Sequence, residues 1–167
     1  MPLVISDAST LIHLAGIGRL ALLKEIYEKI VIPAAVWAEV VEQGRGRSGA
    51  MEVEVARQAG WIEVLSPTNE PLVHLLKRDL DGGEAEAIAL AIERQADLLL
   101  LDESDARKVA ERYNLPKTGV IGLLIRAKRE SRIASLQTEL DTLRSRAGFW
   151  IAEELYQQVL RVVEEMD

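Results

Sequence analysis

The sequence predicts an α/β protein in which helices cover both faces of a parallel β-sheet. Through the first 120 residues, short apolar runs alternate with segments of helical periodicity. Three of these runs are too short for helices and suit buried strands: LVIS (3–6), IVI (30–32) and LLLL (98–101). Helical spacing is clearest at 85–92, where apolar residues follow an i, i+3, i+4, i+7 pattern. Strands and helices that alternate in this way are typical of parallel α/β folds.

Local features predict where the elements begin and end. Asp7 or Ser9 can cap the first helix, which breaks at the glycines of segment 16–18 before a second apolar stripe. Pro33 suits the first turn of the next helix, and Thr118 is expected to cap a helix at 119–127. We expect a further strand at 61–65 and further helices at 50–59, from 72 to the Asp-Gly-Gly turn at 81–83, at 104–113, at 134–146 and at 150–166.

Length and composition favour a single globular domain. The chain has 167 residues, of which 49% are hydrophobic, so it can bury a core. Its apolar runs are too short to cross a bilayer, and the N-terminal MPLVISD lacks the basic region and cleavage site of a signal peptide. The absence of Cys excludes a disulfide framework and fits a reducing compartment. We therefore expect a cytoplasmic protein that has no contact with a membrane.

Charge is distributed unevenly along the chain. The net charge of −7 is unusual for a protein that handles nucleic acid. Segment 107–146, however, has ten Lys or Arg against four acids, a balance of +6, which leaves −13 for the rest of the chain. This balance fits a basic lobe beside an acidic cleft, and it fits an ordinary solvated helical surface equally well.

Five carboxylates stand where apolar runs change into turns or helices: Asp7, Glu39, Glu84, Asp102 and Asp105. Asp7 and Asp102 directly follow strand-like runs, and parallel sheets bind ligands at the carboxyl ends of their strands. Each acid also has an ordinary structural interpretation. Asp7 can be a helix cap, and Asp102 and Asp105 can form a capping box. Glu39 can be a solvated surface residue, and Glu84 can stabilise the N-terminus of its helix through the helix dipole.

Carboxylates gathered at one sheet edge would suit a hard divalent cation. Mg²⁺ and Mn²⁺ favour oxygen ligands, and Mg²⁺ takes only one or two carboxylates while it keeps several waters. With no Cys and two His, a zinc or thiol centre is not expected. His13 and His74 lie among aliphatic residues, so we expect both to pack at the edge of the core.

Five segments carry a resemblance to a known family: VISDASTLIHLA, IPAAVWAEV, DGGEAEAIALA, LLLLDESDARKVA and LPKTGVIGLL. In this order they resemble the PIN-domain nucleases, specifically the PIN-like group related to the VapC toxins of toxin–antitoxin pairs. They span residues 4–125, about three quarters of the chain. The resemblance implies a PIN-like three-layer α/β/α sandwich. It further implies a catalytic domain at 1–130 and a C-terminal helical extension at 131–167, packed on the same domain or on a partner.

The resemblance also implies a catalytic centre for metal-dependent RNA hydrolysis. Asp7, Glu84 and Asp105 would bind Mg²⁺ or Mn²⁺ directly, with Asp102 as a further ligand or a positioning group. Glu39 would bind the metal through water or activate the nucleophile. The metal would polarise the scissile phosphate and lower the pKa of a bound water.

Substrate contacts are expected from residues near these acids. The resemblance places the Ser9 hydroxyl near the metal, and Arg107 directly follows the acidic turn. Arg45 and Arg47 lie on a glycine-rich loop that a nucleic-acid strand could contact. The chain has only seven aromatic residues and no alternation of basic and aromatic residues, so a base-stacking platform is not expected.

The function that the resemblance implies is an endoribonuclease, the toxin of a toxin–antitoxin pair, acting as a homodimer with a cognate antitoxin protein. One alternative is a PIN-like domain with weakened catalysis that acts as a protein-binding or regulatory module. A second is a response-regulator-like phosphoacceptor, which also gathers Asp at strand ends. That second alternative gives no role to Glu39 or to the GGEAEAI segment.

Overall fold

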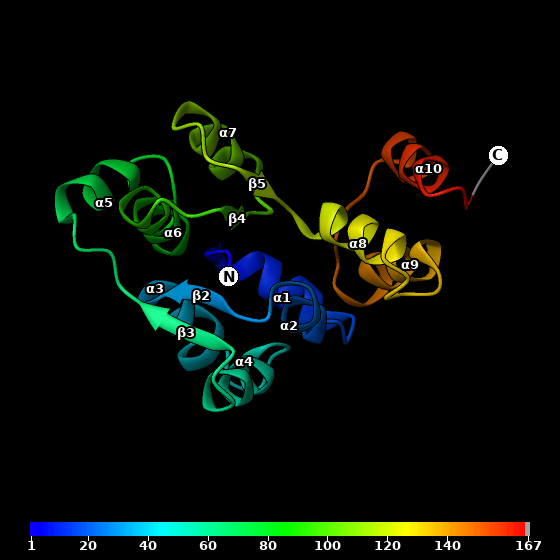
Figure 1. Cartoon of the computed structure of the whole chain (residues 1–167), viewed down its shortest axis with the longest axis horizontal. Helices are drawn as coiled ribbons and strands as arrows, with labels where there is room; N and C mark the ends of the chain where they lie inside the picture. Colours follow the sequence, from blue (N-terminus) through cyan, green and yellow to red (C-terminus); the bar gives the residue numbers. More distant parts are fainter. Residues whose placement is uncertain (166–167) are drawn as a thin grey trace.

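The computed structural model describes residues 1–165, which form a five-stranded sheet with helices on both faces (Figure 1). The strand order is β3-β2-β1-β4-β5, and every neighbouring pair is parallel. This arrangement confirms the predicted α/β class. The strands are β1 Val4–Ser6, β2 Ile30–Pro33, β3 Ile62–Leu65, β4 Leu98–Leu100 and β5 Lys117–Thr118.

Most helices begin and end close to the predicted positions. The helix predicted from 72 to the turn at 81–83 ends at Leu76. The helix predicted at 150–166 spans only Glu153–Val162, and Met166 lies outside the described residues. The helices are α1 Ala8–Gly16, α2 Ala21–Tyr27, α3 Ala34–Trp37, the π-helix η1 Ala38–Glu42, α4 Ala50–Gln58, α5 Glu70–Leu76, α6 Gly82–Arg94, α7 Ser104–Arg112, α8 Val120–Arg129, α9 Leu136–Arg146 and α10 Glu153–Val162.

Alternate residues of each strand face opposite layers of the sandwich. Val4 and Leu100 belong to a core shared with α1, α2, α4 and α8. Ile5 and Leu99 belong to a second core, shared with α5, α6 and α7. Both faces of the central strands are therefore buried, which explains why these strands read as continuous apolar runs rather than as alternating patterns.

Three local details differ from the predictions. Thr118 lies in the edge strand β5 and is not a cap; Gly119 precedes α8 instead. The N-cap of α7 is Glu103, which makes no side-chain capping bond, so the predicted capping box of Asp102 and Asp105 is wrong. The helix after Pro33 becomes a π-helix over Ala38–Glu42. Neither a two-residue strand nor a π-helix has enough periodicity to be recognised in a sequence.

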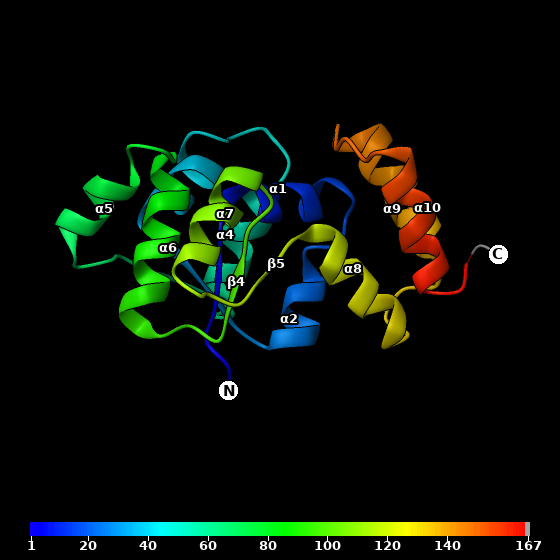
Figure 2. The ribbon, with the colours of Figure 1, turned by 90° about the horizontal axis from the view of Figure 1, so that it is seen from above.

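The C-terminal helices lie together with α8 at one end of the molecule (Figure 2). Leu136 and Leu140 of α9 and Tyr156 and Leu160 of α10 belong to the same apolar core as α1 and α2. The division at residue 130 stays a prediction, but apolar packing joins the two sides of it. No helix within residues 1–165 is long and apolar enough to cross a membrane.

Candidate functional site

Two of the five acids meet at the carboxyl edge of the sheet. β1 and β4 are neighbours, with Ser6 paired to Leu100, so the residues that follow them emerge side by side. The Asp7 amide donates a hydrogen bond of 3.0 Å to the Leu100 carbonyl, and the Asp102 amide donates one of 3.1 Å to Asp7 Oδ2. This edge is where parallel α/β sheets place ligands.

The Asp7 carboxylate is buried, with 1% of the residue exposed. Its Oδ1 accepts a 2.9 Å hydrogen bond from the Thr10 amide, which confirms its predicted role as the cap of α1. The pKa of Asp7 is raised to about 6, chiefly by burial and also by the nearby Asp102 carboxylate, against the hydrogen bonds that lower it. No cation of the described chain is among the groups that shift this pKa.

The Asp102 carboxylate is held by protein groups on both oxygens. Its Oδ1 accepts a 2.8 Å hydrogen bond from the Val120 amide and lies 3.6 Å from Arg107 Nη2. Its Oδ2 lies 2.6 Å from His13 Nδ1. The Arg107 guanidinium is fixed in turn, because its Nε donates to the Leu101 carbonyl. The sequence placed His13 at the core edge and missed this contact, since residues 13 and 102 meet only through the fold.

Glu84 enters the site from the N-terminus of α6. A reciprocal capping box holds it there: the Glu84 amide donates to Asp81 Oδ1, and Glu84 Oε1 accepts from the Asp81 amide. Burial raises the pKa of Glu84 to about 7, with contributions from the carboxylates of Asp81, Asp7 and Glu103. The contribution of Asp7 means that the start of α6 lies within electrostatic range of the end of β1.

Glu39 lies near the N-terminus of α6 and comes from a different element of the chain. It lies in the π-helix η1, a form that shifts the side chains that follow it and is frequent at functional sites. A Cβ on Gly83 would lie 3.3 Å from the Val36 side chain, a tight contact, and 3.7 Å from Glu39 Oε1, an ordinary one, so Val36 and Glu39 both lie against the first turn of α6. Burial and the Asp81 carboxylate raise the pKa of Glu39.

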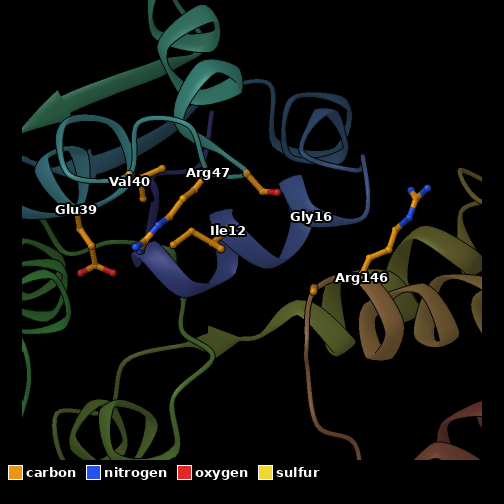
Figure 3. A pocket seen from close by; sticks show the side chains of 9 residues that line it. Ile12, Gly16, Glu39, Val40, Arg47 and Arg146 are labelled. Carbon is orange, nitrogen blue, oxygen red and sulfur yellow. The ribbon is translucent and has the colours of Figure 1, made fainter.

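A hollow of about 320 Å³ opens beside Glu39, between α1, the loop after η1 and the end of α9 (Figure 3). Arg47 reaches from the loop toward the start of α1, and Arg146 comes from α9, beyond Gly16 (Figure 3). Both arginines are exposed, and neither makes an ion pair within residues 1–165. The hollow therefore offers the Arg47 guanidinium on the side of Glu39 and the Arg146 guanidinium at its far end (Figure 3).

A second hollow, of about 540 Å³, opens between α7, β5, the start of α8 and the segment that leads into α10. Asp102 and Arg107 line it together with Lys117, and the segment before α10 contributes Phe149 and Trp150. The edge of the Phe149 ring meets the face of His13 at a centroid distance of 4.8 Å. The C-terminal segment thus contacts the site through His13.

Comparison with known proteins agrees with this geometry. The family model described as PIN domain (DUF3368) matches residues 3–165. The chain belongs to the PIN-domain family. A solved structure similar to this PIN domain is that of a PilT N-terminus domain protein, SSO1118, from the hyperthermophilic archaeon Sulfolobus solfataricus P2. It has 21% sequence identity and a TM-score of 0.57, over 75% of this chain and 92% of that chain.

At this level of identity the likeness shows the fold, and it confirms the expected PIN-like α/β architecture. No curated protein sequence matches the chain. The PIN domain is generally a nuclease fold, so membership in this family supports nuclease activity but does not identify the substrate.

Two predicted site residues of this PIN domain have other surroundings than expected. The Asp105 carboxylate is exposed and lines a separate hollow with Asp79 and Lys108. Its role as a metal ligand stays a prediction. The Ser9 hydroxyl donates a 3.3 Å hydrogen bond to Glu103. Glu103, which lies between Asp102 and Asp105 in the sequence, was not predicted to be part of the site.

The donor chemistry of the site suits a hard divalent cation, although the acids do not converge on one point. Within residues 1–165, no three His, Asp or Glu side chains are close enough to hold a metal. Two carboxylates are enough for Mg²⁺, and Asp7 and Glu84 are buried acids whose pKa values are raised to about 6 and about 7 by burial first and by neighbouring carboxylates second. The Thr10 hydroxyl beside Asp7 is the one buried side-chain polar atom of the described chain without a hydrogen-bond partner.

Proposed function

We propose that this PIN domain is an endoribonuclease that depends on Mg²⁺ or Mn²⁺ and hydrolyses phosphodiester bonds. The observation that carries the proposal is the pair of buried acids, Asp7 and Glu84, whose pKa values are raised to about 6 and about 7 by burial and by neighbouring carboxylates. A divalent cation would relieve this repulsion, polarise the scissile phosphate and lower the pKa of a bound water.

Each surrounding residue would have a distinct task in this reaction. Asp7 and Glu84 would hold the cation. Asp102, with both oxygens already engaged, would position the Asp7 turn rather than bind metal directly. The pKa of Glu39 is raised by burial and by Asp81, which makes it a stronger base than an ordinary carboxylate, so it could accept the proton of the attacking water.

The substrate strand would be held by cations on either side of the acids. Arg47 and Arg146 line the hollow beside Glu39 and make no ion pair within the described chain, so they are free to bind phosphates. By contrast, six of the ten cations in segment 107–146 are already ion-paired: Arg107, Lys117, Arg126, Lys128, Arg132 and Arg144. The predicted basic lobe is therefore largely neutralised, and affinity would depend on these two arginines.

The test is cleavage of a labelled RNA by wild type and by Asp7→Asn, with Mn²⁺ or with a chelator. We expect cutting by wild type only with the metal, and a loss of at least about 100-fold in Asp7→Asn, since even partners that support metal ligands contribute 10- to 100-fold. Asp79→Asn changes an exposed acid outside the site and should cut like wild type. Metal-independent cutting, or full activity in Asp7→Asn, would exclude the mechanism.

A second candidate function is a PIN domain with weakened catalysis that acts by binding a protein partner. Two observations favour it: no three acidic or His groups of residues 1–165 converge, and Asp102 is already satisfied by protein groups. Wild type that neither binds Mn²⁺ in calorimetry nor cuts RNA would support this candidate.

We further propose, from the resemblance to VapC-related proteins, a toxin role with a cognate antitoxin and a homodimeric state. A small adjacent gene for a DNA-binding antitoxin would support the pairing. A monomeric mass in light scattering would exclude the homodimer.

A further inference from the structure

The hollow lined by Asp102 contains an exposed aromatic side chain that the chemistry of phosphodiester hydrolysis does not require. Trp150 is 83% exposed, although large aromatic side chains dominate buried cores and interfaces. Its neighbours are fixed: Phe149 packs edge-on against His13, and Ile151 is buried, with its carbonyl accepting a 3.0 Å hydrogen bond from Arg144. Trp150 is therefore held outward by a segment anchored on both sides.

The charges of this hollow balance. Arg107 lies 3.6 Å from Asp102, and Lys117 lies 3.2 Å from Glu111. All four line the hollow, so two cations are matched by two acids. A phosphate here would have to separate paired cations from their partners, whereas an uncharged planar group with hydrogen-bonding edges would not. The occupant that fits is a ring that stacks, rather than an anion.

Two glycines, Gly119 and Gly122, line part of this hollow. A Cβ on Gly119 would lie 2.7 Å from Asp102 Oδ1 and would overlap the Arg107 guanidinium. A Cβ on Gly122 would overlap the Thr118 hydroxyl. Glycine at both positions leaves this side of the hollow open. The volume of about 540 Å³ is in the range of small-molecule pockets and exceeds what a single nucleobase occupies.

We propose that Trp150 is a base-stacking position for one nucleotide of single-stranded RNA, next to the bond that the acids cleave. It would be a single stacking residue, in contrast to the platform of several aromatic residues that the composition argues against. The proposal rests on the nuclease function, because Asp102 lines this hollow and also donates its amide to Asp7. A strand whose scissile bond lies at the acids would have a neighbouring base within the hollow that Asp102 and Trp150 line together. Every base has a face that can stack, so this contact adds affinity with little preference for sequence.

The experiment measures binding of a fluorescent oligouridylate in a chelating buffer, where no cutting takes place. Removal of a stacking aromatic weakens binding by about 5- to 100-fold, and we expect this loss in Trp150→Ala. Trp150→Phe, which keeps a ring, should restore most of the affinity. Tyr113→Ala removes another exposed aromatic, outside the hollow, and should bind like wild type.

A second set of oligonucleotides locates the contact. Each carries one abasic nucleotide at a different place. Wild type should lose affinity at one place in particular, and Trp150→Ala should be insensitive there, because the lost base and the lost ring belong to the same contact. Equal affinity of Trp150→Ala and wild type, or no binding of oligouridylate by wild type, would overturn the proposal. So would a Trp150→Ala variant that keeps RNA affinity and changes its mass in light scattering, since Trp150 would then contact a second copy of the chain.

The stacking position and the nuclease function can fail separately. If Trp150→Ala binds RNA weakly and wild type with Mn²⁺ does not cut, the stacking position stands and the nuclease function falls. If wild type cuts and Trp150→Ala cuts with an unchanged KM, the nuclease function stands and the stacking position falls.

Discussion

The Asp7 carboxylate caps the first turn of α1 and also forms a hydrogen bond with the turn after β4. Oδ1 accepts from the Thr10 amide and Oδ2 from the Asp102 amide. These bonds explain how a charge can be buried at the sheet edge, and burial still raises the pKa to about 6. An acid whose folded pKa is raised destabilises the fold progressively as the pH rises from the unfolded pKa, 3.8, through about 6.

Asp7→Asn should therefore gain stability relative to wild type as the pH rises. The penalty for ionising Asp7 grows by about 2 kcal/mol between about pH 4.5 and about pH 8. Asn keeps one acceptor for the cap and loses the bond from the Asp102 amide, at a cost of about 1 kcal/mol at any pH. Urea unfolding of both proteins across this range, without divalent cations, measures the difference. Asp79→Asn, at an exposed acid, should show no such trend, and a flat difference for Asp7→Asn would contradict the raised pKa.

At the residue scale, the sequence predicted where Asp7 and Asp102 lie better than how they are held. Asp7 and Asp102 could be placed at the same sheet edge because each directly follows an apolar run. The roles of His13, Asp81 and Glu103 could not be predicted, because their contacts with Asp102, Glu84 and Ser9 depend on side-chain packing between elements. Asp105 illustrates the converse: adjacency in sequence to Asp102 did not bring its side chain to Asp7.

At the scale of elements, the chain builds the site from the ends of β1 and β4 and the N-terminus of α6. Periodicity was enough to predict these three elements, since buried strands read as apolar runs and α6 has a clear apolar face. The two-residue strand β5 and the π-helix η1 were not predictable, and both affect the site. Thr118 and Gly119 line the hollow beside Asp102, and Glu39 projects from η1.

Gly119→Ala should damage the site more than the fold. The added Cβ would overlap the Arg107 guanidinium and lie 2.7 Å from Asp102 Oδ1, so Arg107 must move away from Asp102. We expect a stability loss of about 1–3 kcal/mol, as for other overpacked positions, together with weaker RNA cleavage.

The matched control is Gly60→Ala. Gly60 has a φ of +89° and open space around it, so alanine costs about 1–2 kcal/mol through backbone strain and touches nothing in the site. Thermal denaturation and RNA cleavage of both variants separate the two effects. Comparable activity losses in the two variants would show that general destabilisation, rather than the Arg107–Asp102 pair, limits activity.

At the scale of the whole molecule, Asp7 and Glu84 influence each other electrostatically only because the fold brings the end of β1 near the start of α6. The electrostatic result is an uncompensated cluster, in which Asp81, Asp7 and Glu103 raise the pKa of Glu84. Such a cluster lowers the stability of the metal-free fold, and a bound cation would restore that stability. One metal site shared by Asp7 and Glu84 is the central claim.

Calorimetric titration of Mn²⁺ tests this claim most directly, on wild type and on the variants Asp7→Asn, Glu84→Gln and Asp105→Asn. Wild type should bind Mn²⁺ and release protons on binding near pH 6.5, because Asp7 and Glu84 are partly protonated there without metal. Asp7→Asn and Glu84→Gln should each lose binding, and Asp105→Asn should keep it. Unchanged binding in both Asp7→Asn and Glu84→Gln, or its loss in Asp105→Asn, would contradict the account.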